Sequence, residues 1–215
     1  MRSLLLLVVV AACSSKPDPK AEACRAMRHS AAKTAKLAIK SAQATKQLPE
    51  PFERLGQPAE DTSDEAFVDT VQATISGLQA DNMDATIAAD KARQTLGPES
   101  ARVFEALAVA LDGEGDYAPA WAAAQAQLKR YDDIVADQRR KLDELSTRTA
   151  EAKKRIDARI AGGIQDPLLR NALDKQLKLL DNQTKLHELQ RGALDLDAYD
   201  FLKHSMTSIE QLCTR

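Results

Sequence analysis

The residue types that most often carry chemistry are few in this chain and far apart. Its 215 residues include three histidines, His29, His187 and His204, and three cysteines. None of the histidines has a second histidine three or four positions along the same predicted helix, which is the spacing that holds a metal ion. We therefore expect solvated or locally hydrogen-bonded histidines and no metal site.

A calcium loop is the next chemistry to consider. Asp112, Glu114 and Asp116 match the first ligand positions of an EF-hand, but Tyr117 stands where that loop needs glycine. Ala123 stands where it needs a bidentate glutamate. Glycine-rich phosphate loops, G-x-S-x-G elbows and H-E-x-x-H helices are absent too. The sequence therefore predicts no enzyme and no cofactor, although an unrecognised pair of catalytic carboxylates stays open.

The composition narrows the fold class. Hydrophobic residues make up 44% of the chain, charged residues 29% and aromatic residues only 4%, with 37 alanines and 26 leucines. Alanine and leucine favour helices, whereas the β-branched and aromatic residues that favour strands are scarce. The formal net charge of -2 gives no reason to expect nucleic acid as a partner. These proportions predict an all-α protein.

Apolar periodicity divides the chain into helices. One helix is predicted over residues 21–48, ending before a proline-containing loop. A second is predicted from Thr62, whose hydroxyl is placed to form a capping box with Glu65. Gly97 and Pro98 should end that helix near Leu96, and a short helix should follow to residue 111.

The clearest periodic signal is a pair of long helical arms. Residues 117–161 keep heptad spacing, and residues 167–213 form a second leucine-rich run with a break or kink near Gly192. Arms of equal length predict an antiparallel hairpin of roughly 65–70 Å. We expect the shorter first two helices to brace its base and its tip to project about 20 Å beyond them. The predicted fold is an elongated antiparallel helical bundle, one domain over residues 21–215, with a coiled-coil hairpin over 117–213.

The start of the chain has the layout of a secretory signal. Arg2 precedes an apolar run, Leu4–Val10, and two alanines precede Cys13. Seven helical residues cover about 10 Å, too little for the roughly 30 Å of hydrocarbon in a bilayer. The segment Val10-Ala11-Ala12-Cys13 resembles the lipobox of bacterial lipoproteins. An ordinary signal followed by a chance cysteine is the alternative.

The lipobox resemblance implies a cellular location. It implies that residues 1–12 are cleaved, that Cys13 is acylated, and that residues 13–20 tether the helical domain to a membrane. Several acyl chains on one residue hold a soluble domain at a bilayer almost permanently. Ser14 stands where, in this family, an aspartate favours retention at the inner membrane. We therefore expect the outer membrane, facing the periplasm, with the cell surface as the alternative.

If Cys13 carries lipid, Cys24 and Cys213 remain as a pair. Export makes a disulfide between them chemically permitted, and two free cysteines are the alternative. A bond closing a loop of about 190 residues would stabilise the fold by roughly 5 kcal/mol. It would also hold both ends of the chain at one end of the bundle, which requires an even number of long passes, such as the four predicted here.

These features together suggest a function class. An anchor, a coiled-coil arm and no recognisable chemistry predict a non-enzymatic envelope protein that binds a protein partner. Apolar residues at the hairpin tip are the predicted contacts, namely Ile156, Ile160, Ile164 and Leu168. These side chains could instead pack only against one another within the hairpin. A periplasmic holdase that grips unfolded clients is the alternative function, and an enzyme of unknown class is a third.

Overall fold

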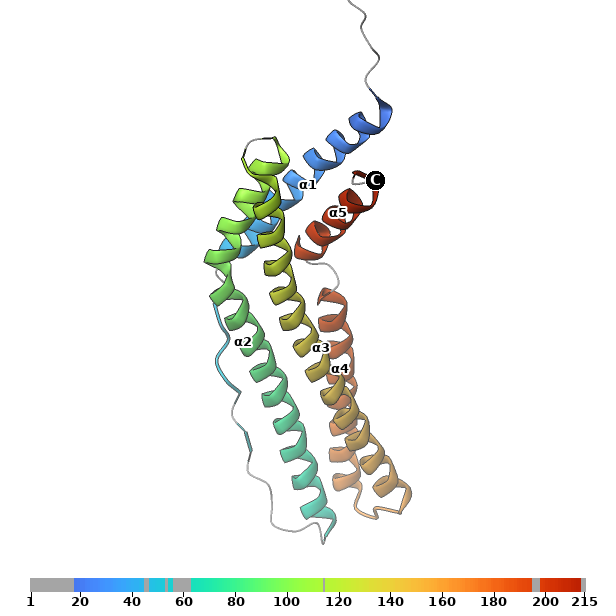
Figure 1. The fold of residues 1–215 in the computed structure, drawn as a ribbon. Helices are drawn as coiled ribbons and strands as arrows, with labels where there is room; N and C mark the ends of the chain where they lie inside the picture. The colour runs from blue at the N-terminus through green and yellow to red at the C-terminus, as the bar shows by residue number, and fades with distance from the viewer. Residues whose placement is uncertain are drawn as a thin grey trace, which may run out of the picture.

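The computed structural model contains five helices and no strand among the residues it describes, which are 18–44, 47–52, 54–55, 63–113, 115–194 and 198–213. The helices pack into an elongated bundle (Figure 1), which confirms the predicted all-α fold. They are α1 (Pro19–Gln43), α2 (Asp64–Leu111), α3 (Tyr117–Ala161), α4 (Pro167–Leu194) and α5 (Ala198–Cys213).

Local sequence accounts for the helix ends. The Asp18 side chain accepts a hydrogen bond from the Lys20 backbone N–H and caps α1. Ser63 caps α2 by accepting from the Ala66 N–H at 3.1 Å. The predicted cap, Thr62, lies outside the described residues, so the cap that the structure shows is one residue later. Both ends of α3 agree with the prediction.

The second helix does not stop at Gly97-Pro98, which corrects the prediction of two helices there. α2 continues through Pro98 to Leu111. A proline inside a helix costs about 3 kcal/mol, but packing on both sides offsets that cost. Gly97 meets the end of α1, and Gln127 of α3 donates a hydrogen bond to Ser100 at 3.2 Å. Figure 1 shows α2 changing direction where α1 crosses it.

Two hydrophobic cores divide the bundle along its length. We call the half that holds both described chain ends the terminal half, and the half that holds the α3–α4 turn the distal half. α1, α5 and the adjoining parts of α2 and α3 enclose the terminal core, whereas the rest of α2 and α3 enclose the distal core with α4. The largest fully buried side chains come from both halves: Phe104, Leu107 and Leu202 from the terminal core, and Leu78, Ile156, Leu173 and Leu180 from the distal core.

The hairpin tip does not project beyond its support, which corrects the expected overhang. α2 has 48 residues, or about 72 Å at 1.5 Å per residue, and its first turn lies beside the end of α3. There the Arg159 guanidinium donates to Asp64 at 2.7 Å and lies 5.2 Å from the Phe67 ring centroid. The distal half is therefore a three-helix bundle up to its tip.

The second arm of the hairpin is divided into two helices near Gly192, as predicted. That glycine lies inside α4, which continues to Leu194, and α5 begins at Ala198. α5 packs on α1 and α3, and its Tyr199 ring stacks on Tyr131 with centroids 4.0 Å apart. The break allows the last helix to join the terminal half.

Candidate functional site

The distal tip buries most of the residues predicted to contact a partner. Ile156 is fully buried and Ile164 is 8% exposed, both within the distal core, while Ile160 packs against that core. Leu168 alone of the four is open, with 78% of its surface exposed. The three isoleucines therefore pack inside the bundle, which was the alternative to a partner contact.

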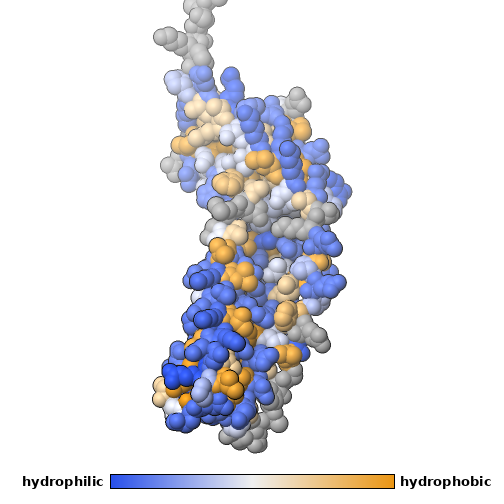
Figure 2. Space-filling view, turned by 180° about the vertical axis from the view of Figure 1, so that it is seen from behind, coloured by the Kyte–Doolittle hydropathy of each residue, from blue (hydrophilic) through white to orange (hydrophobic). Residues whose placement is uncertain are grey.

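Much of the accessible apolar surface lies on α4, which carries four of the ten large hydrophobic side chains that are exposed among the described residues. This helix has nine leucines in 28 residues, more than one helix face can bury. Leu173, Leu180 and Leu194 fill the core. Four others are exposed: Leu168, Leu179, Leu186 and Leu189. Figure 2 shows hydrophobic side chains among charged ones along the distal half, on the side where α4 lies. We call these four residues the α4 leucine face.

A groove lies beside this face, between α2 and α4. It has a volume of about 410 Å³. Its walls include Ile75 and Ser76 of α2, Leu179 of α4, and Phe52 and Leu55 of the segment before α2. The Ser76 hydroxyl accepts a hydrogen bond from the Leu55 backbone N–H at 3.1 Å. That bond holds Leu55 at the edge of the groove.

Three glutamines follow α4 at heptad spacing on the side of this groove. Gln176 lines the groove directly, and Gln183 and Gln190 continue the row. Their Oε1 atoms are buried and have no hydrogen-bond partner in the part of the chain that the structure describes. An unpaired buried amide oxygen costs free energy, so water or a donor from a bound partner would stabilise this row.

A buried polar layer separates the two cores. His187 of α4 is 1% exposed and Asn82 of α2 is 7% exposed. The His187 Nδ1 atom lies 3.5 Å from the Ser146 hydroxyl of α3, whereas its Nε2 atom is buried without a partner among the described residues. Burial lowers the pKa of His187, and the neighbouring positive charge of Arg191 lowers it further. The ring is therefore held neutral near pH 7.

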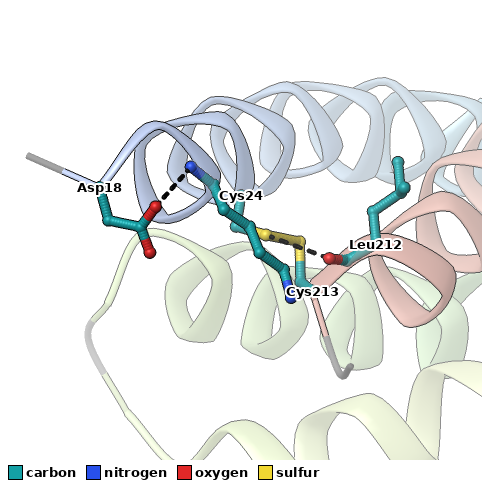
Figure 3. Close-up of a disulfide and its surroundings, with 5 residues drawn as sticks. Asp18, Cys24, Leu212 and Cys213 are labelled. Carbon is teal, nitrogen blue, oxygen red and sulfur yellow. Dashed lines mark hydrogen bonds between the residues drawn. A yellow bond between two sulfur atoms is a disulfide. The ribbon is translucent and has the colours of Figure 1, made fainter.

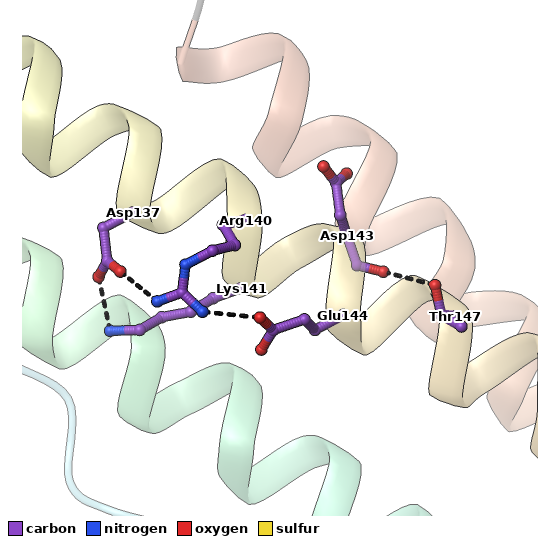
Figure 4. A network of polar contacts seen from close by, with 6 residues as sticks. All are labelled: Asp137, Arg140, Lys141, Asp143, Glu144 and Thr147. Carbon is purple, nitrogen blue, oxygen red and sulfur yellow. Dashed lines mark hydrogen bonds and ion pairs between the residues drawn. The ribbon is translucent and has the colours of Figure 1, made fainter.

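The outer face of α3 carries a network of ion pairs (Figure 4). Asp137 accepts from Arg140 at 2.5 Å and from Lys141 at 2.8 Å, and Arg140 also donates to Glu144 at 2.6 Å. These bonds, first from Lys141 and then from Arg140, lower the pKa of Asp137. The side chains are a third to more than half exposed, so the network is a solvated helix face and not a reaction centre.

The terminal half joins the two ends of the chain. Figure 3 shows the Cys24 and Cys213 sulfur atoms together, with Cα atoms 5.6 Å apart, within the range that a disulfide spans. The predicted pairing is thus confirmed as a meeting of these two residues across 189 positions of sequence. The bond pins the second turn of α1 to the last residue of α5. Cys13 lies outside the described residues.

The three histidines, and Asp112 among the acidic residues considered first for chemistry, have local partners, whereas Glu114 lies outside the described residues. The His29 Nδ1 atom lies 3.4 Å from Asp112, and His204 Nδ1 lies 2.7 Å from the Asp200 carbonyl oxygen. Lys36 also binds Asp112, at 3.3 Å, and the Lys36 and His29 contacts lower the pKa of that carboxyl. Across the described residues, no three histidine, cysteine, aspartate or glutamate side chains gather in a group that could hold a metal ion.

Comparisons with known proteins add no family. Neither a family model, nor a characterised protein, nor a solved structure matches this chain. Within the described ranges, no helix is long and apolar enough to cross a membrane.

The α4 leucine face was not predicted, although the spacing of leucines in the sequence indicates it. The core positions Leu173, Leu180 and His187 recur at steps of seven, and Leu179 and Leu186 repeat the same step one position earlier. Two apolar heptad rows on one helix indicate two contact surfaces. The first row packs in the distal core, and the second row is open.

Proposed function

We propose that this protein is a non-enzymatic, lipid-anchored component of a bacterial cell envelope that binds a protein partner through the α4 leucine face. Cys13 would carry the lipid, and the outer membrane, facing the periplasm, would be its location. The observation that carries the proposal is the exposure of Leu168 and Leu189, at 78% and 72%, on a helix with a filled core face.

The position of Cys13 relative to the bundle supports an anchor at one end and a partner surface at the other. Asp18, the first described residue, lies five positions after Cys13 and begins α1 at the end where α5 also finishes. Five residues reach at most about 18 Å. A lipid on Cys13 would therefore hold the terminal half near the bilayer, and the distal half with α4 would extend away from it.

The chemistry of the surface indicates the kind of partner. A partner helix laid in the groove between α2 and α4 would meet apolar side chains from Leu179, Ile75 and Phe52. If the side chains of Gln176, Gln183 and Gln190 turned outward, amide or basic groups at heptad spacing on that helix could donate to their oxygens, which are buried in the free protein. We therefore propose an amphipathic helix with hydrogen-bond donors beside its apolar stripe.

The anchor is tested by the intact mass of the protein purified from membranes. The mass expected is that of residues 13–215 with acyl chains on Cys13. An unmodified mass, or a chain that begins at another residue, would exclude the proposed anchor without bearing on the partner surface.

The partner surface is tested by recovery of bound proteins from the envelope. Leu168→Asp combined with Leu189→Asp should abolish recovery of a partner that wild type retains, because a charge would be placed in the apolar contact. Phe201→Asp on α5, where phenylalanine is 56% exposed, is the matched control and should retain the partner. Equal recovery by all three folded proteins would refute the assignment of this face.

A holdase remains the second candidate, and one observation favours it. The α4 leucine face is open and beside a groove, so extended apolar segments of unfolded clients could also bind there. Suppression of aggregation of an unrelated unfolded protein, lost in the same double variant, would support the holdase. A single stoichiometric partner would support the first proposal.

A further inference from the structure

The first helix differs in charge from the rest of the chain. α1 has six basic residues and one acidic residue, Glu22, in 25 positions, which gives it a net charge of +5. Because the whole chain carries -2, the residues outside α1 carry a net -7. The positive charge is thus concentrated on the helix closest in sequence to the lipobox cysteine.

The basic residues gather on the open side of α1. At 100° per residue, Arg25, Lys33, Lys36 and Lys40 fall within an arc of about 80°, and all four are exposed. The opposite side packs on α2 and α5 through four alanines with at most 1% of their surface exposed: Ala31, Ala32, Ala35 and Ala38. We call the arc of four basic residues the α1 basic face.

Most of this charge is not neutralised by any other residue that the structure describes. The side chains of Arg25, Lys33 and Lys40 form no ion pair or hydrogen bond with any residue that the structure describes. Lys36 is the exception, since it binds Asp112. Three cations at steps of eight and seven residues therefore project from one helix without a counter-charge among the described side chains.

Two features fix how this face is presented. The disulfide pair Cys24–Cys213 joins α1 beside Arg25 to the end of α5, so the helix cannot swing away from the bundle. The alanine contacts bring the second half of α1 close to α2, and Gly97 of α2 meets the backbone of Ala42. The basic face is therefore a rigid surface and not a loose tail.

We propose that the α1 basic face binds the anionic headgroups of a phospholipid bilayer. Basic residues next to a lipid anchor add an electrostatic attachment to the hydrophobic one, and a row along one helix side suits a plane of negative charge. Leu37, exposed beside the row, could enter the interface between headgroups and acyl chains. This inference uses the proposed anchor only to place α1 near a membrane.

The test measures binding of the full chain to vesicles without the lipid. Cys13→Ser prevents acylation at that position, and sedimentation is compared between vesicles of phosphatidylcholine alone and of three parts phosphatidylcholine to one part phosphatidylglycerol. The apolar run Leu4–Val10 is present in every variant and contributes equally to each. Near an anionic surface each basic residue is worth roughly fivefold in partitioning, so Arg25→Gln with Lys33→Gln and Lys40→Gln should weaken binding roughly 100-fold.

A charge-matched variant distinguishes binding through the α1 basic face from an effect of net charge alone. Arg170→Gln with Lys175→Gln and Lys178→Gln removes one arginine and two lysines from α4, all exposed, and should change binding less than threefold. Binding by the unsubstituted α1 should also fall steeply at about 0.5 M salt, because screening shortens the reach of the charges.

A loss of tenfold or more confined to the α1 variant would support the proposal. A smaller loss, an equal loss in both variants, or equal binding to the two vesicle types would overturn it and leave the basic face for an acidic protein. Because Cys13 is replaced throughout, failure here is independent of whether the native protein carries lipid. Far-UV circular dichroism confirms that each variant remains helical.

Discussion

Replacing Gly97 by alanine should loosen the packing of α1 on the bundle. Gly97 lies inside α2 where α1 ends against it, and an added Cβ would lie 2.3 Å from the carbonyl oxygen of Ala42. That oxygen belongs to backbone, which cannot rotate aside as a side-chain tip can. The end of α1 must therefore move back by about 1 Å to reach an ordinary contact distance, and its alanine contacts must move with it.

Two effects of opposite sign decide the magnitude. Alanine is about 1 kcal/mol better than glycine inside a helix. Overpacking a tight contact costs about 1–3 kcal/mol, which outweighs that gain over most of its range. We therefore expect Gly97→Ala to lower the free energy of unfolding by up to about 2 kcal/mol.

Gly77 provides the matched control, because it lies in the same helix with no atom near its added Cβ. Gly77→Ala should raise the free energy of unfolding by about 0.5–1 kcal/mol. Urea unfolding of the three proteins measures both changes, and hydrogen exchange should show reduced protection in α1 for the Gly97 variant alone. A Gly97→Ala protein at least as stable as wild type would refute the close approach of α1 and α2.

Three further predictions follow from burial, the buried histidine and the disulfide pair. Ile156→Ala should cost about 2–5 kcal/mol of unfolding free energy, because the side chain is fully buried. The exposed Leu168 provides the comparison, and Leu168→Ala should cost less than about 0.5 kcal/mol. Equal costs would contradict the burial of the tip. The lowered pKa of His187 means that the unfolded chain takes up a proton that the native protein rejects, so stability should be full above pH 6.5 and fall as the pH drops below it. His187→Gln should flatten urea midpoints between pH 5 and 7, and an unchanged slope would assign the effect elsewhere. Reduction of the Cys24–Cys213 bond, which spans 189 positions, should cost up to about 5 kcal/mol, and midpoints insensitive to reductant would show that the bond does not contribute.

The sequence was most informative where local signals and packing agree. Tyr117–Ala161 was predicted to the residue, because a heptad pattern fills it and Gly162-Gly163 follows it. Gly163 has a φ of +92°, a conformation that favours glycine. At Gly97-Pro98 the same kind of local signal was wrong. The free-energy cost of a proline inside the helix is smaller than the stabilisation from packing on α1 and α3. That packing cannot be read from any single segment of the sequence.

The error at Pro98 also explains why the hairpin tip was expected to project beyond its support. A helix ending near residue 96 would be too short to brace the whole hairpin, so the tip with its isoleucines was expected to lie beyond the shorter helices. The continuous α2 instead begins at the tip, where Phe67 covers Ile156 and Ile164 within one core. A continuous α2 thus covers most of the hairpin tip that was predicted to bind a partner.

Covering the tip changes where a partner can bind. Once Ile156 and Ile164 are interior, the distal half keeps an open apolar surface on α4, which contributes its Leu173–Leu180 row to the core and leaves Leu179 and Leu186 outside. The terminal half has α1 on its own surface instead, where Arg25, Lys33 and Lys40 are unpaired among the described residues. An apolar face at one end and a cationic face at the other need different partners. A bilayer and a helical protein satisfy both needs without competing for the same residues.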